Sequence, residues 1–142
     1  AYDIITSQQQ QAGQMYGWLT QWGLPQTSPN GPMAWMSSDQ ERPPGPSAST
    51  MPGMDHGSSG DAAMPGMAAA DDLQRLQSST GRDAERIFLQ LMIAHHHGGV
   101  SMAQAVLERT QRTEVRTLAT AIVTAQSAEI TQMQQLLDKT SS

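Results

Sequence analysis

Apolar residues recur every three or four positions in two long segments near the C-terminus, residues 82–109 and 113–138. This spacing places an apolar stripe along one face of an α-helix. The stripe of the first segment consists of Ile87, Phe88, Leu91, Met92, His95, Met102, Val106 and Leu107, and that of the second consists of Val115, Leu118, Ala119, Ile122, Met133, Leu136 and Leu137. The short link "TQRT" joins the segments, so they predict an antiparallel helical hairpin.

Two further helices are predicted nearer the N-terminus, over residues 3–22 and 71–78. The first contains no proline and stops at Gly23, with Pro25 close behind. Residues 23–70 change to a Pro-, Gly-, Ser- and Met-rich composition that cannot hold a regular element for long. We therefore expect a single domain over residues 1–142 that contains a long Met/Pro/Gly-rich connection.

An internal repeat relates the first helix to the last. Aligning residues 4–19 with 122–137 gives identical residues at six of sixteen positions, among them Gln8 with Gln126 and Met15 with Met133. The repeat predicts that the N-terminal helix closes a preceding half-repeat, which is truncated here.

The composition of the chain reduces the number of fold classes and functions that it could have. Charged residues make up 15% of the chain and aromatic residues 4%, which favours an all-α protein. The net charge of −5 argues against nucleic-acid binding, because no basic stripe exists to neutralise phosphates. No apolar segment approaches the roughly 20 residues that span a bilayer. The chain has ten methionines and no cysteine, so any soft metal ligand must be a thioether.

Three consecutive histidines stand inside an apolar run, "LMIAHHHGGVSMA", at residues 91–103. At 100° per residue, Met92, His95, His96 and Met102 fall within about 120° of one another, whereas His97 points elsewhere. Gly98 and Gly99, which follow, each cost about 1 kcal/mol in a helix and indicate a bend or the close approach of another backbone.

The facing helix carries polar residues in its apolar stripe. Gln126 and Glu129 lie between Ile122 and Met133. Buried polar groups need partners. We expect Gln126, Glu129 and Met133 to surround the histidines as supporting residues rather than as ligands.

The connection contains "MPGM" twice, and the first copy continues into "DHG". These motifs add five candidate ligands, Met51, Met54, His56, Met64 and Met67. Thioethers combined with imidazole favour Cu(I), and Ag(I) by the same softness argument, whereas zinc, calcium and magnesium prefer other residues. The alternative is a flexible linker whose methionines are incidental.

The segment "MPGMAAADDLQRLQSSTGRDAERIFLQLMIAHHHGGVSMA", followed by "LATAIVTAQSAEITQMQQLL", resembles the DUF305 family, which includes secreted or periplasmic copper-binding members. The family's Met, His pair and Met-Ala fall on Met92, His95, His96, Met102 and Ala103. The resemblance implies a ferritin-like helical bundle, an extracytoplasmic location in the periplasm, outside the cell or at the cell envelope, and copper binding. A first histidine pair, which the family pattern also has, is missing here.

The expected function is therefore non-catalytic binding of copper for storage, buffering or resistance, with Cu(I) favoured, Ag(I) as a mimic and Cu(II) as a further candidate. The alternatives are a ferritin-like di-iron oxidoreductase and a metal-free helical interaction module. Di-iron sites need a Glu-x-x-His pair, and Met92, Ile93 and Ala94 precede the histidines by three positions instead. The apolar stripe of the N-terminal helix also predicts a homodimer.

Overall fold

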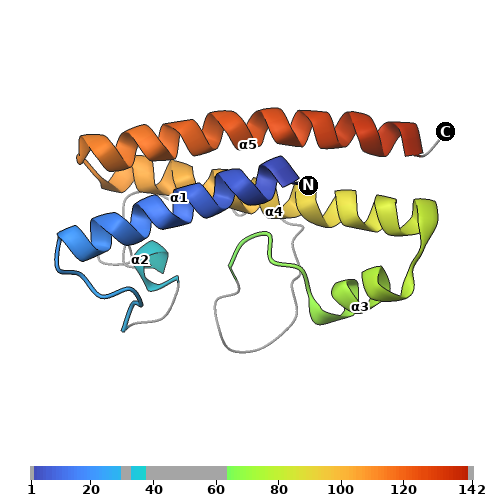
Figure 1. The fold of residues 1–142 in the computed structure, drawn as a ribbon, viewed down its shortest axis with the longest axis horizontal. Coiled ribbons are helices and arrows are strands. Elements are labelled where there is room, and N and C mark those ends of the chain that lie inside the picture. The colour runs from blue at the N-terminus through green and yellow to red at the C-terminus, as the bar shows by residue number, and fades with distance from the viewer. Residues whose placement is uncertain (1, 30–32, 38–63, 141–142) are drawn as a thin grey trace, which may run out of the picture. The chain divides into compact units, whose positions relative to one another are not determined.

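The computed structural model of the protein describes residues 2–29, 33–37 and 64–140, and this part of the chain contains helices and no strand. The helices are α1 (Tyr2–Gln21), α2 (Ala34–Ser37), α3 (Ala70–Ser78), α4 (Gly81–Arg109) and α5 (Thr113–Thr140) (Figure 1). The predicted all-α class is confirmed, and the four predicted helices begin and end within two residues of their expected bounds.

The chain divides into two compact units, residues 1–63 and 64–142. In the first unit, α1 ends at a Schellman motif: Gly23, at φ 64°, donates its N–H to the Thr20 carbonyl, and Leu24 donates to Leu19. Gly23 therefore ends the helix as predicted. The connection expected over residues 23–70 contains the short helix α2, and its last residues belong to the second unit.

In the second unit, α4 and α5 form the predicted antiparallel hairpin (Figure 1), joined by three residues, 110–112. Five of the six buried residues of the two helices are spaced by seven or fourteen positions. They are Leu89, His96 and Ala103 on α4 and Ala119 and Met133 on α5; the sixth is Gly98. Such spacing keeps one line of side chains facing the partner helix. We call this line the seam; Gln126 lies midway between its two α5 members.

The seam differs from the predicted stripe of α4 by one position. Phe88, expected in the core, is 39% exposed, whereas its neighbour Leu89 is 5% exposed. Consecutive helical residues point about 100° apart, so only one of the two can face α5. Leu89 lies seven residues before His96 and takes that place.

Arg116 connects the end of α4 to the start of α5. Its Nη1 donates to the carbonyl oxygens of Leu107, at 2.6 Å, and Thr110, at 3.1 Å. The last carbonyls of a helix have no partner within the helix. The arginine therefore satisfies two acceptors at the turn of the hairpin.

Candidate metal centre

His96 lies at the centre of the seam, and its side chain is completely buried. Its Nδ1 lies 2.8 Å from the carbonyl oxygen of Met92, which can only accept a hydrogen bond, and its Nε2 lies 2.8 Å from Oε2 of Glu129 on α5. The predicted contact between an imidazole and a carboxylate across the hairpin is therefore present. Both ring nitrogens of His96 are engaged within the helix pair.

Gln126 lies one turn before Glu129 and faces Gly99. Its Oε1 occupies the place that a Cβ on Gly99 would take. This oxygen is buried and has no hydrogen-bond partner in the described part of the chain. The side-chain oxygen of Gln126 therefore accepts no hydrogen bond from a histidine. It fits against α4 because Gly99 has no side chain. Met133, the third residue expected to support the histidines, is buried in the seam.

The second Met-Pro-Gly-Met motif forms a turn that packs on α4. Met67 donates its N–H to the Met64 carbonyl at 3.2 Å, and Gly66 has φ 79°, a conformation that glycine adopts without steric cost. A Cβ on Gly98 would overlap the carbonyl oxygen of Pro65, and a Cβ on Gly66 would lie 3.0 Å from Cα of His95. Gly98 thus permits the predicted close approach of another backbone.

The remaining predicted residues of α4 lie in different surroundings. His97 is exposed, as the helical wheel predicted, while His95, Met92 and Met102 are partly exposed. Met92 and Met102 are ten residues apart, which is a rise of about 15 Å along a helix. The two thioethers therefore cannot bind one ion together. The residues that the wheel placed on one face, Met92, His95, His96 and Met102, consequently do not form a single metal site.

The first motif, with Met51, Met54 and His56, lies outside the described residues. Within residues 2–29, 33–37 and 64–140, no group of three or more His, Asp or Glu side chains is arranged to hold a metal ion. In this part of the chain, the turn that packs on α4 at the histidine run carries the thioethers of Met64 and Met67.

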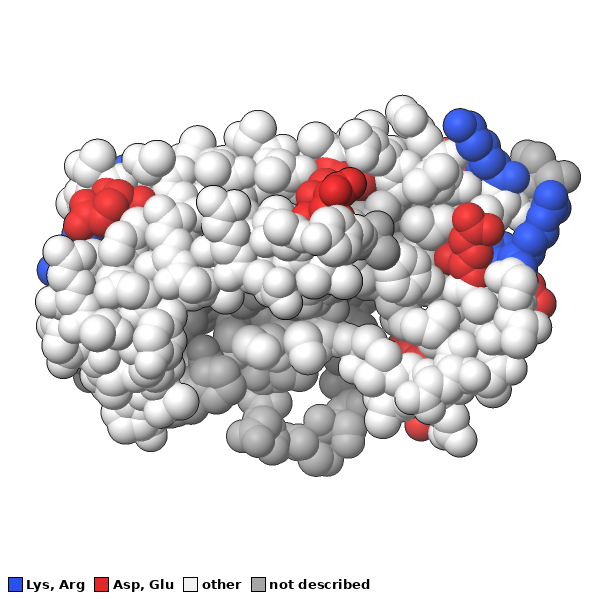
Figure 2. Space-filling view, in the orientation of Figure 1, with Lys and Arg blue, Asp and Glu red and all other residues white. Residues whose placement is uncertain are grey.

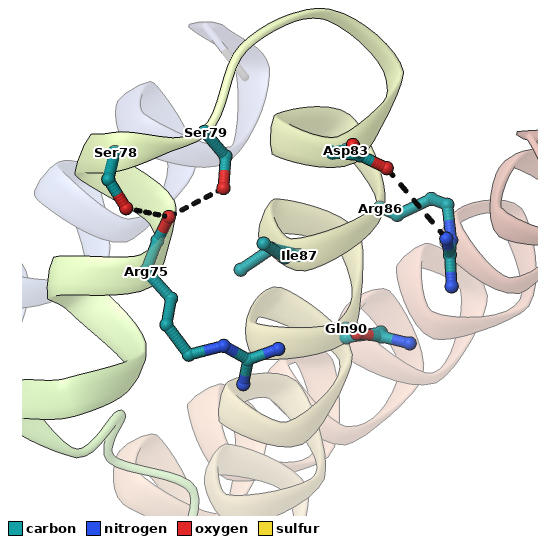
Figure 3. A pocket seen from close by; sticks show the side chains of 7 residues that line it. All are labelled: Arg75, Ser78, Ser79, Asp83, Arg86, Ile87 and Gln90. Carbon is teal, nitrogen blue, oxygen red and sulfur yellow. Dashed lines mark hydrogen bonds and ion pairs between the residues drawn. The ribbon is translucent and has the colours of Figure 1, made fainter.

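A polar hollow of about 360 Å³ lies between α3 and α4, and sequence reasoning did not predict it (Figure 3). It is lined by Arg75, Ser78, Ser79, Asp83, Arg86, Ile87 and Gln90. Arg75 pairs with Asp72 at 3.2 Å, and Arg86 with Asp83 at 3.9 Å. The charges are compensated locally, and the hollow contains none of the candidate metal ligands.

Charged side chains are sparse on the face that Figure 2 shows, and no basic stripe crosses it among the described residues. None of the helices in the described ranges is both long and apolar enough to cross a membrane.

Comparison with known proteins identifies the family. The DUF305 family, described as "Domain of unknown function (DUF305)", matches residues 1–137. The crystal structure of a "putative secreted protein DUF305" from Streptomyces coelicolor is 35% identical, with a TM-score of 0.76, and the alignment covers 99% of this chain and 72% of that one. A DUF305 fragment from Deinococcus radiodurans is 32% identical, with a TM-score of 0.67, over 97% and 72% of the two chains. No curated protein matches. The chain thus belongs to the DUF305 family.

Proposed function

We propose that this protein binds copper outside the cytoplasm, as Cu(I) and with Ag(I) as a mimic, for storage, buffering or resistance. The observation that carries the proposal is the packing of the Met64–Met67 turn on α4 beside His95. Two thioethers and an imidazole thereby belong to one region of the second unit. This donor set suits a soft monovalent ion better than Zn(II) or Ca(II).

The extracytoplasmic location is supported by the Streptomyces relative, which is described as a "putative secreted protein". The absence of cysteine from the sequence leaves the redox compartment open, and it makes the thioether of methionine the soft side-chain ligand that the sequence offers.

Competition for Cu(I) against a chromophoric chelator tests the proposal, with Zn(II) binding measured in parallel. We expect the protein to withdraw Cu(I) from the chelator and to bind Zn(II) more weakly. Failure to compete for Cu(I), together with stoichiometric Zn(II) binding, would overturn the soft-site proposal.

A metal-free helical interaction module is the second candidate, and the hydrogen bonds of His96 favour it, because they explain this buried histidine without a metal. The same titration separates the two functions. A module without a metal site would neither withdraw Cu(I) from the chelator nor bind Zn(II).

A further inference from the structure

The two histidines that the helical wheel places on one face of α4, His95 and His96, differ in the availability of their ring nitrogens. A metal ion binds a histidine through a ring nitrogen that carries no hydrogen. In His96, Nδ1 donates to Met92, and Nε2 faces the carboxylate of Glu129 in a fully buried position. A metal ion could reach His96 only by displacing Glu129 and opening the seam.

His95 is in the opposite situation. It is partly exposed, and its ring nitrogens have no hydrogen-bond partner among the described residues. Its ring lies 6.1 Å from that of His96, centre to centre, and the two planes are inclined by 74°. The adjacent rings therefore point into different surroundings.

The turn formed by residues 64–67, which carries a methionine at each end, packs its backbone against α4 at this histidine. The backbone of Gly66 contacts Ala94 and His95, and that of Pro65 contacts Gly98. Met64 and Met67 flank these two residues and are 37% and 57% exposed, so their side chains remain available to a ligand. The backbone between the two methionines is thereby held against α4 at His95.

We propose that His95, Met64 and Met67 form a preorganised site for Cu(I) and Ag(I), and that His96 is a structural residue that joins α4 to α5. This inference rests on the proposed copper-binding function and specifies its ligands. Because the backbone that carries the two methionines is already held against α4, less conformational entropy is lost when the ion binds. Gly66 and Gly98 act as positioning residues, because they allow the turn to lie against the helix.

Titration of the full chain with Ag(I) tests the assignment, followed by NMR of methionine methyl groups and histidine rings. We expect the signals of His95, Met64 and Met67 to shift, whereas the ring signals of His96 keep their positions. His95→Ala, and separately the double variant Met64→Leu/Met67→Leu, should each weaken Ag(I) binding at least about tenfold, equivalent to about 1.4 kcal/mol. The matched controls His97→Ala and Met102→Leu should change it less than about threefold.

A pair of glycine variants tests the positioning role of the turn. Gly66 and Gly81 both have positive φ, at 79° and 58°, so an alanine is strained at either position. A Cβ on Gly66 would overlap Ala94, whereas one on Gly81 would have nothing within 4 Å. Gly66→Ala should therefore weaken Ag(I) binding, and Gly81→Ala should not. Circular dichroism verifies that both variants remain helical.

The outcomes separate this inference from the function on which it rests. If the unmodified chain binds neither Ag(I) nor Cu(I), the proposed function and the site fall together. If it binds them but the His95 and Met64/Met67 variants retain full affinity, or the His96 ring signals move instead, the ligand assignment is overturned while the copper-binding function stands.

Discussion

At the scale of single residues, neighbouring histidines have separate roles because a helix turns about 100° between them. His96 occupies the centre of the seam and bonds to Glu129, while His97 is exposed. The helical wheel could place His95 and His96 on the same side of α4. It could not show which of the two rings is bonded in the core, since that depends on the position of α5.

Removing the partner of His96 should destabilise the hairpin. Glu129→Ala leaves a fully buried ring nitrogen without its hydrogen-bond partner, which costs about 1–3 kcal/mol of unfolding free energy. Glu129→Gln keeps an oxygen at the same place and should cost less. Urea denaturation measures both, with the exposed Glu85→Ala on α4 as the control. Equal stability of Glu129→Ala and Glu85→Ala would contradict the role of the pair.

The buried oxygen of Gln126 predicts a stabilising substitution. Gln126→Met replaces the amide with an apolar side chain of similar length and removes the unpartnered Oε1, so we expect a gain of about 1 kcal/mol. The matched control Gln132→Met, at an exposed position of the same helix, should change stability by less than about 0.5 kcal/mol. A loss of stability at Gln126 would mean that the amide has a partner that the fold requires.

At the scale of elements, the glycines of the helices fall into two classes. Gly98 meets the backbone of the Met64–Met67 turn, whereas a Cβ on Gly17 of α1 would meet nothing within 4 Å. Alanine is favoured over glycine by about 1 kcal/mol inside a helix. The same substitution should therefore have opposite effects at the two positions.

Thermal unfolding of Gly98→Ala and Gly17→Ala measures this difference. We expect the first variant to be destabilised despite its better helix propensity, because the new Cβ overlaps Pro65 and displaces the turn. The second should gain up to about 1 kcal/mol. A gain at Gly98 as large as that at Gly17 would show that the turn does not depend on close contact with α4.

The link between α4 and α5 depends on Arg116. Arg116→Met keeps the apolar stem but removes the hydrogen bonds to Leu107 and Thr110, and we expect a loss of about 1–2 kcal/mol of unfolding free energy. Chemical denaturation measures the loss, with the exposed Arg82→Met as the control. An equal effect of the two substitutions would show that the hydrogen bonds of Arg116 do not stabilise the hairpin.

The helices could be predicted from the sequence because their apolar periodicity is local. Contacts between elements were harder to predict. The glycine pair indicated that something approaches α4, but nothing in the sequence identified it as the Pro65–Gly66 backbone. Phe88 and Leu89 show the same limit: both are apolar neighbours, and the position of α5 decides which one is buried. Met92 and Met102 shared a face on the wheel, yet the rise of the helix separates them.

At the scale of the whole molecule, α1 exposes several large apolar side chains, namely Tyr2, Ile5, Met15 and Tyr16. Met15 is exposed although its repeat equivalent, Met133, is buried. Burying a large apolar side chain is favourable by about 1.5–3 kcal/mol, and two-fold pairing is the most common way in which copies cover such a face.

We therefore propose a homodimer, which light scattering at tens of micromolar protein tests. The expected mass is twice that of one chain, and Ile5→Ser/Tyr16→Ser should shift it towards a single chain. The matched control Gln9→Ser/Thr20→Ser changes exposed polar positions of α1 and should leave the mass unchanged. A monomeric mass for the unmodified chain, with a cooperative unfolding transition, would exclude the dimer.

The polar pair at the centre of the seam, His96 and Glu129, also affects the register in which α4 packs against α5. A seam of apolar residues repeating every seven positions can slide by two turns and still bury similar side chains. A slide of this size would separate His96 from Glu129 and leave the imidazole facing an apolar surface. A single buried polar pair can thus specify the alignment of two helices at some cost in stability. The pair makes one alignment of α4 and α5 preferable to its neighbours, and it thereby holds the histidine run opposite the same part of α5 in every molecule.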